Sequence, residues 1–298
     1  MKQVTHLKAE LILVFVTILA GFGWIFSKEA LAGLPPLFFM GVRFIIAGFV
    51  LFLAGQKYFR GLDWQDVKQA SLVGMVMGIA MMFWVTGLDQ GSNLGVGAFI
   101  TSLGVVLVPV VARFMFGARP ALSIWIALPI AVLGLGFLAL NNGLDFEFAH
   151  VYFLGAALGS ALQLNLLSRF SMRMHALVLT AIQLSVAGCL LLFLSLLTET
   201  LPHSISIEVA GWFLASTLIA SSLRFLLQTY GMSLTPVSHA AVIMNLEPVW
   251  TAIFAVFWFS ESMGVGQVIG CLLIFIAMIV SRWPQIRAIF KPKRSYSL

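Results

Sequence analysis

Apolar runs long enough to cross a lipid bilayer follow one another along almost the entire chain. A helix that crosses the hydrocarbon core needs about 20 predominantly apolar residues, with a range of roughly 17–25. Ten stretches of the sequence meet this requirement, at residues 10–28, 36–55, 66–87, 94–115, 121–140, 151–170, 176–197, 208–230, 237–259 and 264–282. The turns between them are short and carry Pro or Asn-Gly breakers at several places. The sequence therefore predicts an all-α integral membrane protein with ten transmembrane helices.

The composition argues against several other classes of protein. Of the 298 residues, 61% are hydrophobic and 9% are charged, whereas a soluble domain carries about 25% charged residues. Cys189 and Cys271 both lie in apolar runs, so neither a disulfide framework nor a metal-ligand cluster is expected. The net charge of +6 comes from residues between the apolar runs, not from a basic stripe on a polar fold. We expect no cofactor, no metal and no nucleic-acid partner.

The Lys and Arg residues predict how the chain is oriented. With both termini in the cytoplasm, Lys28 falls on the outer side, and Arg43 and Arg224 fall within spans. The other fourteen of the seventeen lie on the cytoplasmic side: Lys2, Lys8, Lys57, Arg60, Lys68, Arg113, Arg119, Arg169, Arg173, Arg282, Arg287, Lys291, Lys293 and Arg294. This bias is the positive-inside pattern. It predicts a multi-pass protein of the cell inner (plasma) membrane, with N- and C-termini cytoplasmic.

The two halves of the sequence resemble each other weakly. At an offset of 140 residues, Ala47-Gly48 matches Ala187-Gly188, and the surrounding Leu/Phe pattern continues. At an offset of 143, the sequence AFITSL from Ala98 lies over AVIMNL from Ala241. Two nearly constant offsets in the same order indicate an internal repeat.

The repeat predicts the domain organisation. We expect one five-helix unit at residues 1–143, a second at 144–284 and a basic cytoplasmic tail at 285–298. Because each unit has an odd number of spans, the second enters the membrane in the opposite orientation. Inverted repeats of this kind are common in secondary transporters, whose substrate site lies at the interface of the repeats near the bilayer midplane.

Several motifs extend across both halves. In the first they are Gly23-Trp24 with Lys28, then Leu34-Pro35-Pro36 leading to Arg43-Phe44. In the second they are Asn245-Leu246-Glu247-Pro248, then Ser260-Glu261-Ser262, then Gly266 and Gly270. On these residues the chain resembles the EamA-type, ten-helix members of the drug/metabolite transporter superfamily.

The resemblance implies an inner-membrane carrier that exports or exchanges small metabolites, such as amino acids, nucleotide-linked sugars or drugs. The most specific element is Leu246-Glu247-Pro248, followed by the second glutamate, Glu261, at the next turn. The first half departs from the family pattern, because its equivalent turn at residues 116–120 reads FGARP and contains no glutamate.

Glu247 is the polar residue that most needs an explanation. It lies roughly 15 Å into its predicted span. A carboxyl side chain at this depth must be protonated, be paired with another group or face a water-filled cavity. Pro248 is expected to kink the helix and free a carbonyl, and Asn245 adds a donor and an acceptor nearby. Glu247 is therefore either a substrate- or proton-binding acid, or a brace that pairs with a neighbouring helix. Arg224, roughly 10 Å into its span, is the expected partner for the brace.

Arg43 is the second charged candidate. It lies roughly 10 Å below the outer surface and can bind a substrate carboxylate through its fork of donors. The structural alternative is that Arg43 snorkels outward or bonds carbonyls at a helix end. Its mate in the repeat is Gln183, which is polar but uncharged.

Aromatic and amide side chains complete the set of candidates. Trp24, Trp84 and Tyr230 can stack on a ring or surround a cation, although aromatics in membrane proteins more often serve packing. Gln163 and Gln228 can offer uncharged hydrogen bonds to a substrate or join helices together.

These residues are compatible with three classes of function. The favoured one is a secondary transporter of amino acids or amphipathic, drug-like compounds, working as an efflux carrier by alternating access and coupled to protons through Glu247. The alternatives are a facilitative exchanger or channel without ion coupling, and an intramembrane hydrolase. No H-E-x-x-H, G-x-S-x-G or Walker-type glycine loop occurs in the sequence, so an enzyme is not expected. The expected partners are the lipid bilayer, a small-molecule substrate and protons, for a monomer or a homodimer.

Overall fold

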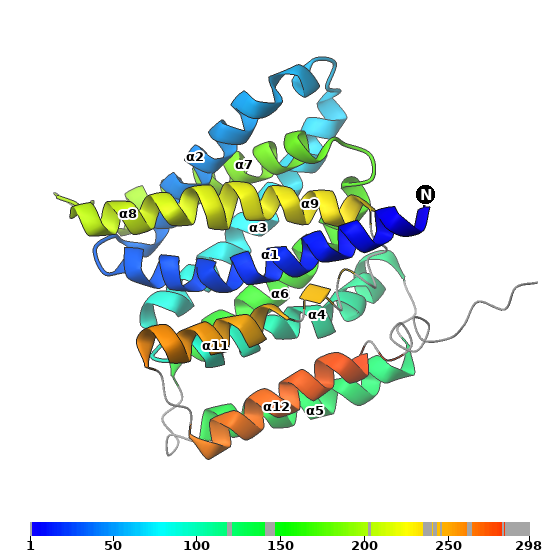
Figure 1. The fold of residues 1–298 in the computed structure, drawn as a ribbon, viewed down its shortest axis with the longest axis vertical. Coiled ribbons are helices and arrows are strands. Elements are labelled where there is room, and N and C mark those ends of the chain that lie inside the picture. The colour runs from blue at the N-terminus through cyan, green and yellow to red at the C-terminus, as the bar shows by residue number, and fades with distance from the viewer. Residues whose placement is uncertain are drawn as a thin grey trace, which may run out of the picture.

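The computed structural model describes residues 2–117, 121–140, 147–201, 204–234, 240, 243–244, 246–260, 264–281 and 283. These residues form helices and turns, without a strand among them (Figure 1). The first half contains α1 (Lys2–Leu31), α2 (Pro36–Gly55), the 3₁₀-helix η1 (Gln56–Phe59), α3 (Trp64–Gln90), α4 (Leu94–Phe116) and α5 (Leu122–Leu140). The second contains α6 (Phe148–Phe170), α7 (Ala176–Thr198), α8 (Ile207–Ala215), η2 (Ser216–Leu223), α9 (Arg224–Leu234), α11 (Glu247–Phe259) and α12 (Val265–Ser281).

The predicted membrane class is confirmed in the described part of the chain. Seven helices there are long and apolar enough to cross a membrane, the last of them formed by α8, η2 and α9 together. Shorter apolar helices occupy Leu122–Gly134, Glu247–Phe259 and Val268–Ser281. Each of these helices overlaps one of the ten predicted runs, so the apolar pattern located the helices correctly.

Proline and polar caps set where several helices begin. Pro36 occupies the first position of α2, where its missing N–H leaves no hydrogen bond unmade. The carboxylate of Glu199, just after α7, accepts hydrogen bonds at 2.8 Å from the backbone N–H groups of Leu37 and Phe38. The Asn93 side chain accepts a backbone N–H in the first turn of α4. These caps satisfy donors that a helix cannot satisfy internally.

Helices α2 and α7 pack closely along their length in antiparallel directions. A Cβ atom at Gly41 would lie 2.7 Å from the backbone N of Leu192, and one at Gly188 would lie 2.7 Å from the backbone N of Ile45. Residue numbers rise along α2 as they fall along the facing part of α7, which defines the antiparallel direction. Absence of a side chain at both glycines is what lets the two backbones approach.

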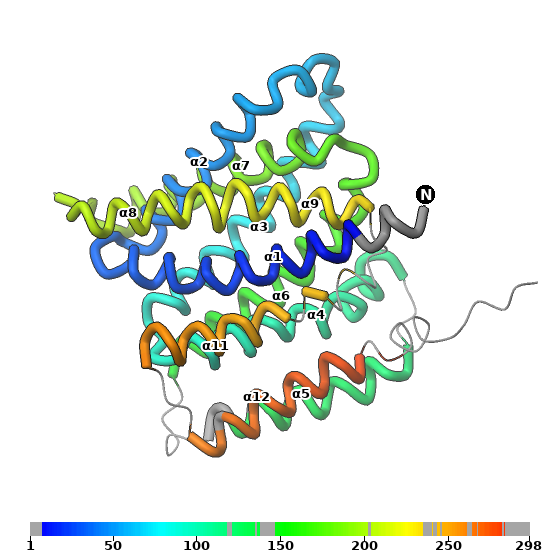
Figure 2. Tube along the Cα trace, in the orientation of Figure 1, coloured from blue at the N-terminus to red at the C-terminus, as the bar shows by residue number. Residues whose placement is uncertain are grey.

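The remaining helices surround this pair and one another. Helix α1 runs between α9 and α11 and contacts both (Figure 2). Helix α12 packs along α5 at one edge of the molecule, and α4 joins this pair to α6 and α11. Helix α3 packs against α6 and α7. Helices of the two halves are therefore packed against one another.

The largest apolar side chains lie both inside and outside this bundle. Phe39, Phe44 and Phe153 are fully buried or nearly so. Phe114 and Phe257, in contrast, are more than four-fifths exposed. An apolar exterior of this kind is unfavourable in water and favourable in lipid, because hydrocarbon tails solvate such side chains.

Candidate functional site

Glu247 begins helix α11, and the local sequence explains why. Leu246 forms a turn with φ −76° and ψ −19°, and its backbone N–H donates to the carbonyl oxygen of Ile243. Pro248 follows in the first turn of α11, where a residue without an N–H is tolerated. The Glu247 carboxylate therefore lies at a helix N-terminus, where the helix dipole favours negative charge.

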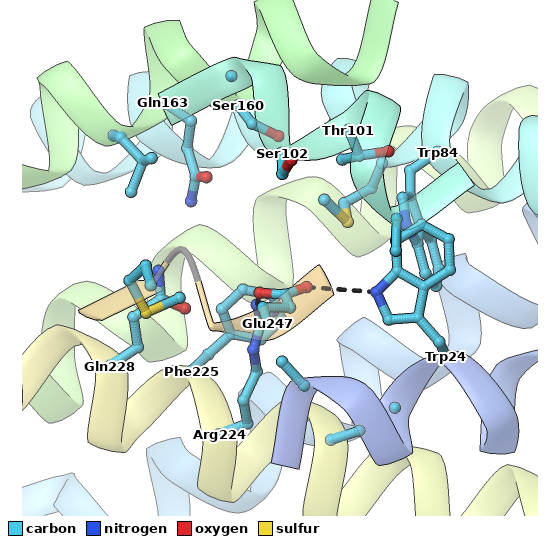
Figure 3. Close-up of a pocket in the computed structure, with 18 of the residues that line it drawn as sticks. Trp24, Trp84, Thr101, Ser102, Ser160, Gln163, Arg224, Phe225, Gln228 and Glu247 are labelled. Carbon is cyan, nitrogen blue, oxygen red and sulfur yellow. Dashed lines mark hydrogen bonds and ion pairs between the residues drawn. The ribbon is translucent and has the colours of Figure 1, made fainter. Parts of the chain in front are cut away.

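Two donors from other helices bind the Glu247 carboxylate. The indole Nε1–H of Trp24 donates to Oε1 at 3.2 Å, and Nη2 of Arg224 donates to Oε2 at 3.1 Å (Figure 3). The ion pair is only partly shielded, with 15% of the Arg224 side chain and 23% of the Glu247 side chain exposed. The partner that the sequence predicts for Glu247 is thus the one observed.

Arg224 follows a stretch of π-helix. Segment η2 widens the turn ahead of it, and Ser222 Oγ donates to the carbonyl oxygen of Thr217, five residues earlier, at 3.0 Å. The Arg224 guanidinium also lies 4.5 Å from the centroid of the Phe225 ring. Single π-turns inside longer helices frequently occur at functional sites. No feature of the sequence identified this one.

Arg43 is 4% exposed and is held by hydroxyl groups. Its Nε donates to Ser221 Oγ at 2.6 Å, and its Nη1 donates to Ser27 Oγ at 2.7 Å. Its guanidinium carbon also lies 5.4 Å from the Phe39 ring centroid. Among the described residues, the partners of Arg43 are therefore neutral, and its positive charge is not cancelled by a carboxylate at hydrogen-bond distance.

These charged groups line a central cavity of about 130 Å³, which has room for several water molecules. Its walls come from α1, α2, α3, α4, α6, η2, α9 and α11. In Figure 3, Glu247 and Arg224 lie on one side of the space, and Thr101, Ser102 and Gln163 lie on the other. Helices from both predicted units thus enclose one cavity, which has an apolar lining and a few charged and polar groups.

One end of the central cavity is aromatic. The ring centroids of Trp24 and Trp84 lie 5.0 Å apart at an interplanar angle of 79°, which is an edge-to-face contact. Phe153 also packs near Trp24, with ring centroids 5.8 Å apart. Because Trp24 also donates to Glu247, it joins the aromatic end of the cavity to the charged side.

Several buried polar atoms that face the central cavity have no hydrogen-bond partner. Gln163 and Gln228 are each 5% exposed, yet Nε2 of the first and Oε1 of the second are unpaired. Nε of Arg224 and Oγ1 of Thr101 are unpaired as well. Such groups are costly to leave unsatisfied. A water or ligand that reached these groups would supply the missing partners.

Most of the predicted site residues meet in this cavity, and two of the described ones do not. Gln183 is fully buried on α7, outside the cavity lining, and both atoms of its side-chain amide are unpaired. Tyr230 on α9 is 46% exposed and does not line the cavity either. Asn245 lies outside the described residues.

The sequence patterns did not identify the hydroxyl-bearing residues of the site. Ser27 and Ser221 hold Arg43, and Thr101, Ser102 and Ser160 line the cavity. A signal existed for Ser160, because it precedes Gln163 by three residues and such residues share a helix face. The described residues contain no group of three or more His, Cys, Asp or Glu side chains that could hold a metal ion.

Comparisons with known proteins agree with this architecture. The family model described as "EamA-like transporter family" matches residues 7–140 and again residues 147–283. An uncharacterized transporter of Archaeoglobus fulgidus is 29% identical over 283 residues, covering 93% of this chain and 86% of that protein. The uncharacterized transporter YvbV of Bacillus subtilis is 26% identical over 278 residues, covering 86% and 90%. A crystal structure 20% identical in sequence has a TM-score of 0.67 and covers 94% of this chain and 98% of its own, which shows a shared fold.

Proposed function

Because the chain belongs to the EamA-like transporter family and is a multi-pass membrane transporter, we propose that it is a secondary carrier for small metabolites such as amino acids or amphipathic, drug-like compounds. The central cavity is its substrate site. The observation that carries this proposal is the central cavity, which both family-matching segments enclose and which Arg43, Arg224 and Glu247 line.

The proposed mechanism is alternating access between two inverted units, residues 1–143 and 144–284. Helices at equivalent places in these units pack against each other: α2 against α7, α4 against α11 and α5 against α12. The antiparallel contact of α2 with α7 is the arrangement that an inverted repeat requires at its axis. Rocking of one unit against the other would open the cavity to each side in turn.

Two energy sources remain as alternatives for the carrier. In the first, Glu247 takes up and releases a proton during each cycle, which couples transport to a proton gradient. In the second, transport is uncoupled exchange or facilitated diffusion, and Glu247 serves as a brace. The direct ion pair between Glu247 and Arg224 supports the second alternative, because a paired acid needs no proton to be stable inside the membrane.

Uptake into inside-out membrane vesicles tests these proposals. Vesicles from cells that express the wild type or Glu247→Gln would be screened with labelled amino acids and amphipathic dyes, with and without an imposed pH gradient. Gradient-driven uptake that Gln abolishes, while substrate exchange survives, would support proton coupling. Gradient-driven transport that survives in Glu247→Gln would eliminate it. Tyr230→Phe, which lies outside the cavity, is the matched control.

The orientation belongs to the same proposal. We place both termini and the basic tail at residues 285–298 on the cytoplasmic side of the inner membrane, from the distribution of Lys and Arg. Uptake into inside-out vesicles corresponds to efflux from the cell, which is the direction we propose.

A further inference from the structure

We propose that the central cavity selects organic carboxylate anions that carry an apolar or aromatic group, and that Glu247 competes with them for Arg224. This inference rests on the proposed function, because it assumes that the central cavity is the substrate site. It concerns the charge of the substrate and the role of one acid, and it needs no coupling ion.

The charges that line the cavity do not balance. Arg43 and Arg224 contribute two positive charges, and Glu247 is the one acid among the described lining residues. Both arginines line the same cavity. Positive charge enclosed in a poorly solvated space is unfavourable until an anion accompanies it. A ligand with one negative charge would complete the balance, whereas a cation would worsen it.

The hydrogen-bonding groups point to the same ligand. The Nε and Nη2 atoms of Arg224 form one edge of its guanidinium, and that edge matches the two oxygens of a carboxylate. Glu247 occupies only the Nη2 position, and Nε has no partner. A ligand carboxylate would use both positions, and it would displace Glu247 from Nη2. The unpaired Nε2 of Gln163 is a further donor in the same cavity.

The remaining lining predicts the rest of the ligand. Trp24 and Trp84 form an aromatic end next to the charged side of the cavity. Aromatic side chains pack favourably on rings and on apolar chains. Gln228 offers one unpaired acceptor, Oε1, which suits a single polar substituent. A zwitterion has no net charge and would leave the excess positive charge of the described lining unbalanced, so an anion is favoured over a zwitterion.

The inference also agrees with the proposed direction of transport. The inside-negative potential across a cell membrane drives anions outward. A carrier of monocarboxylate anions would therefore support efflux without an ATPase domain or a proton gradient.

Binding of three probes of similar shape tests the charge selectivity. Phenylacetate, 2-phenylethanol and phenethylamine have the same ring and carry negative, no and positive charge. They would be titrated against the full-length protein in nanodiscs, with calorimetry and tryptophan fluorescence as readouts, since Trp24 and Trp84 line the cavity. We expect phenylacetate to bind at least about tenfold more tightly than the other two, since charge-assisted hydrogen bonds have this strength. Equal or tighter binding of the amine or the alcohol would overturn the inference.

The competition by Glu247 has its own signature. Glu247→Gln should strengthen phenylacetate binding by about three- to tenfold, because it removes the competing carboxylate. Arg224→Gln should weaken it by at least about tenfold, and Tyr230→Phe should leave it unchanged. Weaker anion binding in a folded Glu247→Gln protein would show that Glu247 supports binding, which contradicts the competition.

Failure of the inference can be told apart from failure of the proposed function. Ser160→Phe projects a large side chain from α6 into the cavity and should abolish binding of every probe. If Ser160→Phe abolishes binding but the amine is the preferred probe, the cavity is the substrate site and the anion selectivity is wrong. If Ser160→Phe folds and binds the probes as the wild type does, the cavity itself is not the site.

Discussion

At the scale of single residues, the molecule accommodates its intramembrane charges by specific contacts. Glu247 lies at a helix N-terminus and receives one cationic and one neutral donor. Arg43 is stabilised differently, by two hydroxyls and two aromatic rings. A buried ion without such partners would be very costly. The hydroxyl groups around Arg43 should therefore contribute measurably to stability.

Ser221→Ala tests this contribution. It leaves Nε of the buried Arg43 without its acceptor, so we expect a loss of about 1–3 kcal/mol in the free energy of unfolding. Thermal unfolding in detergent would measure the change. Ser233→Ala is the control, because the hydroxyl of the partly exposed Ser233 donates only to the backbone carbonyl of Tyr230 and serves no charged group, so its change should stay within about 0.5 kcal/mol. Equal effects of the two variants would contradict the argument.

At the scale of helices, α2 and α7 meet at a seam where their backbones approach closely. The glycines at this seam let the backbones touch, and Glu199 then ties the end of α7 to the start of α2. Single substitutions can remove the glycine contact and the Glu199 cap separately.

Gly41→Ala should destabilise the protein by about 1–3 kcal/mol, because the new methyl group meets the backbone of Leu192. Gly211→Ala is the matched helical control. A Cβ at Gly211 meets nothing within 4 Å, so this variant should be neutral or stabilising by up to about 1 kcal/mol. Melting temperatures of the two purified variants would be compared. An unchanged melting temperature for Gly41→Ala would mean that α2 and α7 can move apart to accommodate the methyl group.

Glu199→Ala should cost about 1–2 kcal/mol, because two N–H groups at the start of α2 lose their acceptor and the helix dipole loses a negative charge. Thr198→Ala, one residue away, removes only an exposed hydroxyl that donates to the carbonyl of Leu194, and should change little. Chemical unfolding curves would separate the two. A Glu199→Ala protein as stable as the Thr198→Ala protein would show that the cap is dispensable.

At the scale of the whole molecule, the orientation in the membrane is the property that the charge distribution predicts. In a background of Cys189→Ser and Cys271→Ser, Ser204→Cys should react with an impermeant maleimide in intact cells. Met172→Cys should react only after permeabilisation, because its turn lies on the cytoplasmic side under the proposed orientation. Both positions are exposed, so access to the reagent is the only difference. The reverse pattern of labelling would invert the orientation.

Much of the architecture could be predicted because the bilayer imposes a simple rule. A span must be apolar over a fixed length and must satisfy its own backbone, so helix positions are encoded locally. The same rule makes an isolated acid conspicuous, and this is why Glu247 and its partner Arg224 could be identified. The π-helix η2 could not be predicted, since its sequence STLIASSL contains no proline or other breaker.

The sequence by itself determined the number and class of the apolar runs and the presence of charges within them, because each depends on residues close together in the chain. Comparison of its two halves determined the weak repeat. Only the tertiary structure decided which side chains share the cavity. Ser221 meets Arg43 across 178 residues of sequence and Trp24 meets Glu247 across 223. It also separated Gln183 and Tyr230 from the cavity that the other candidates line. Contacts of this kind depend on how helices rotate and cross, and apolar helices of similar composition leave that choice to side-chain packing.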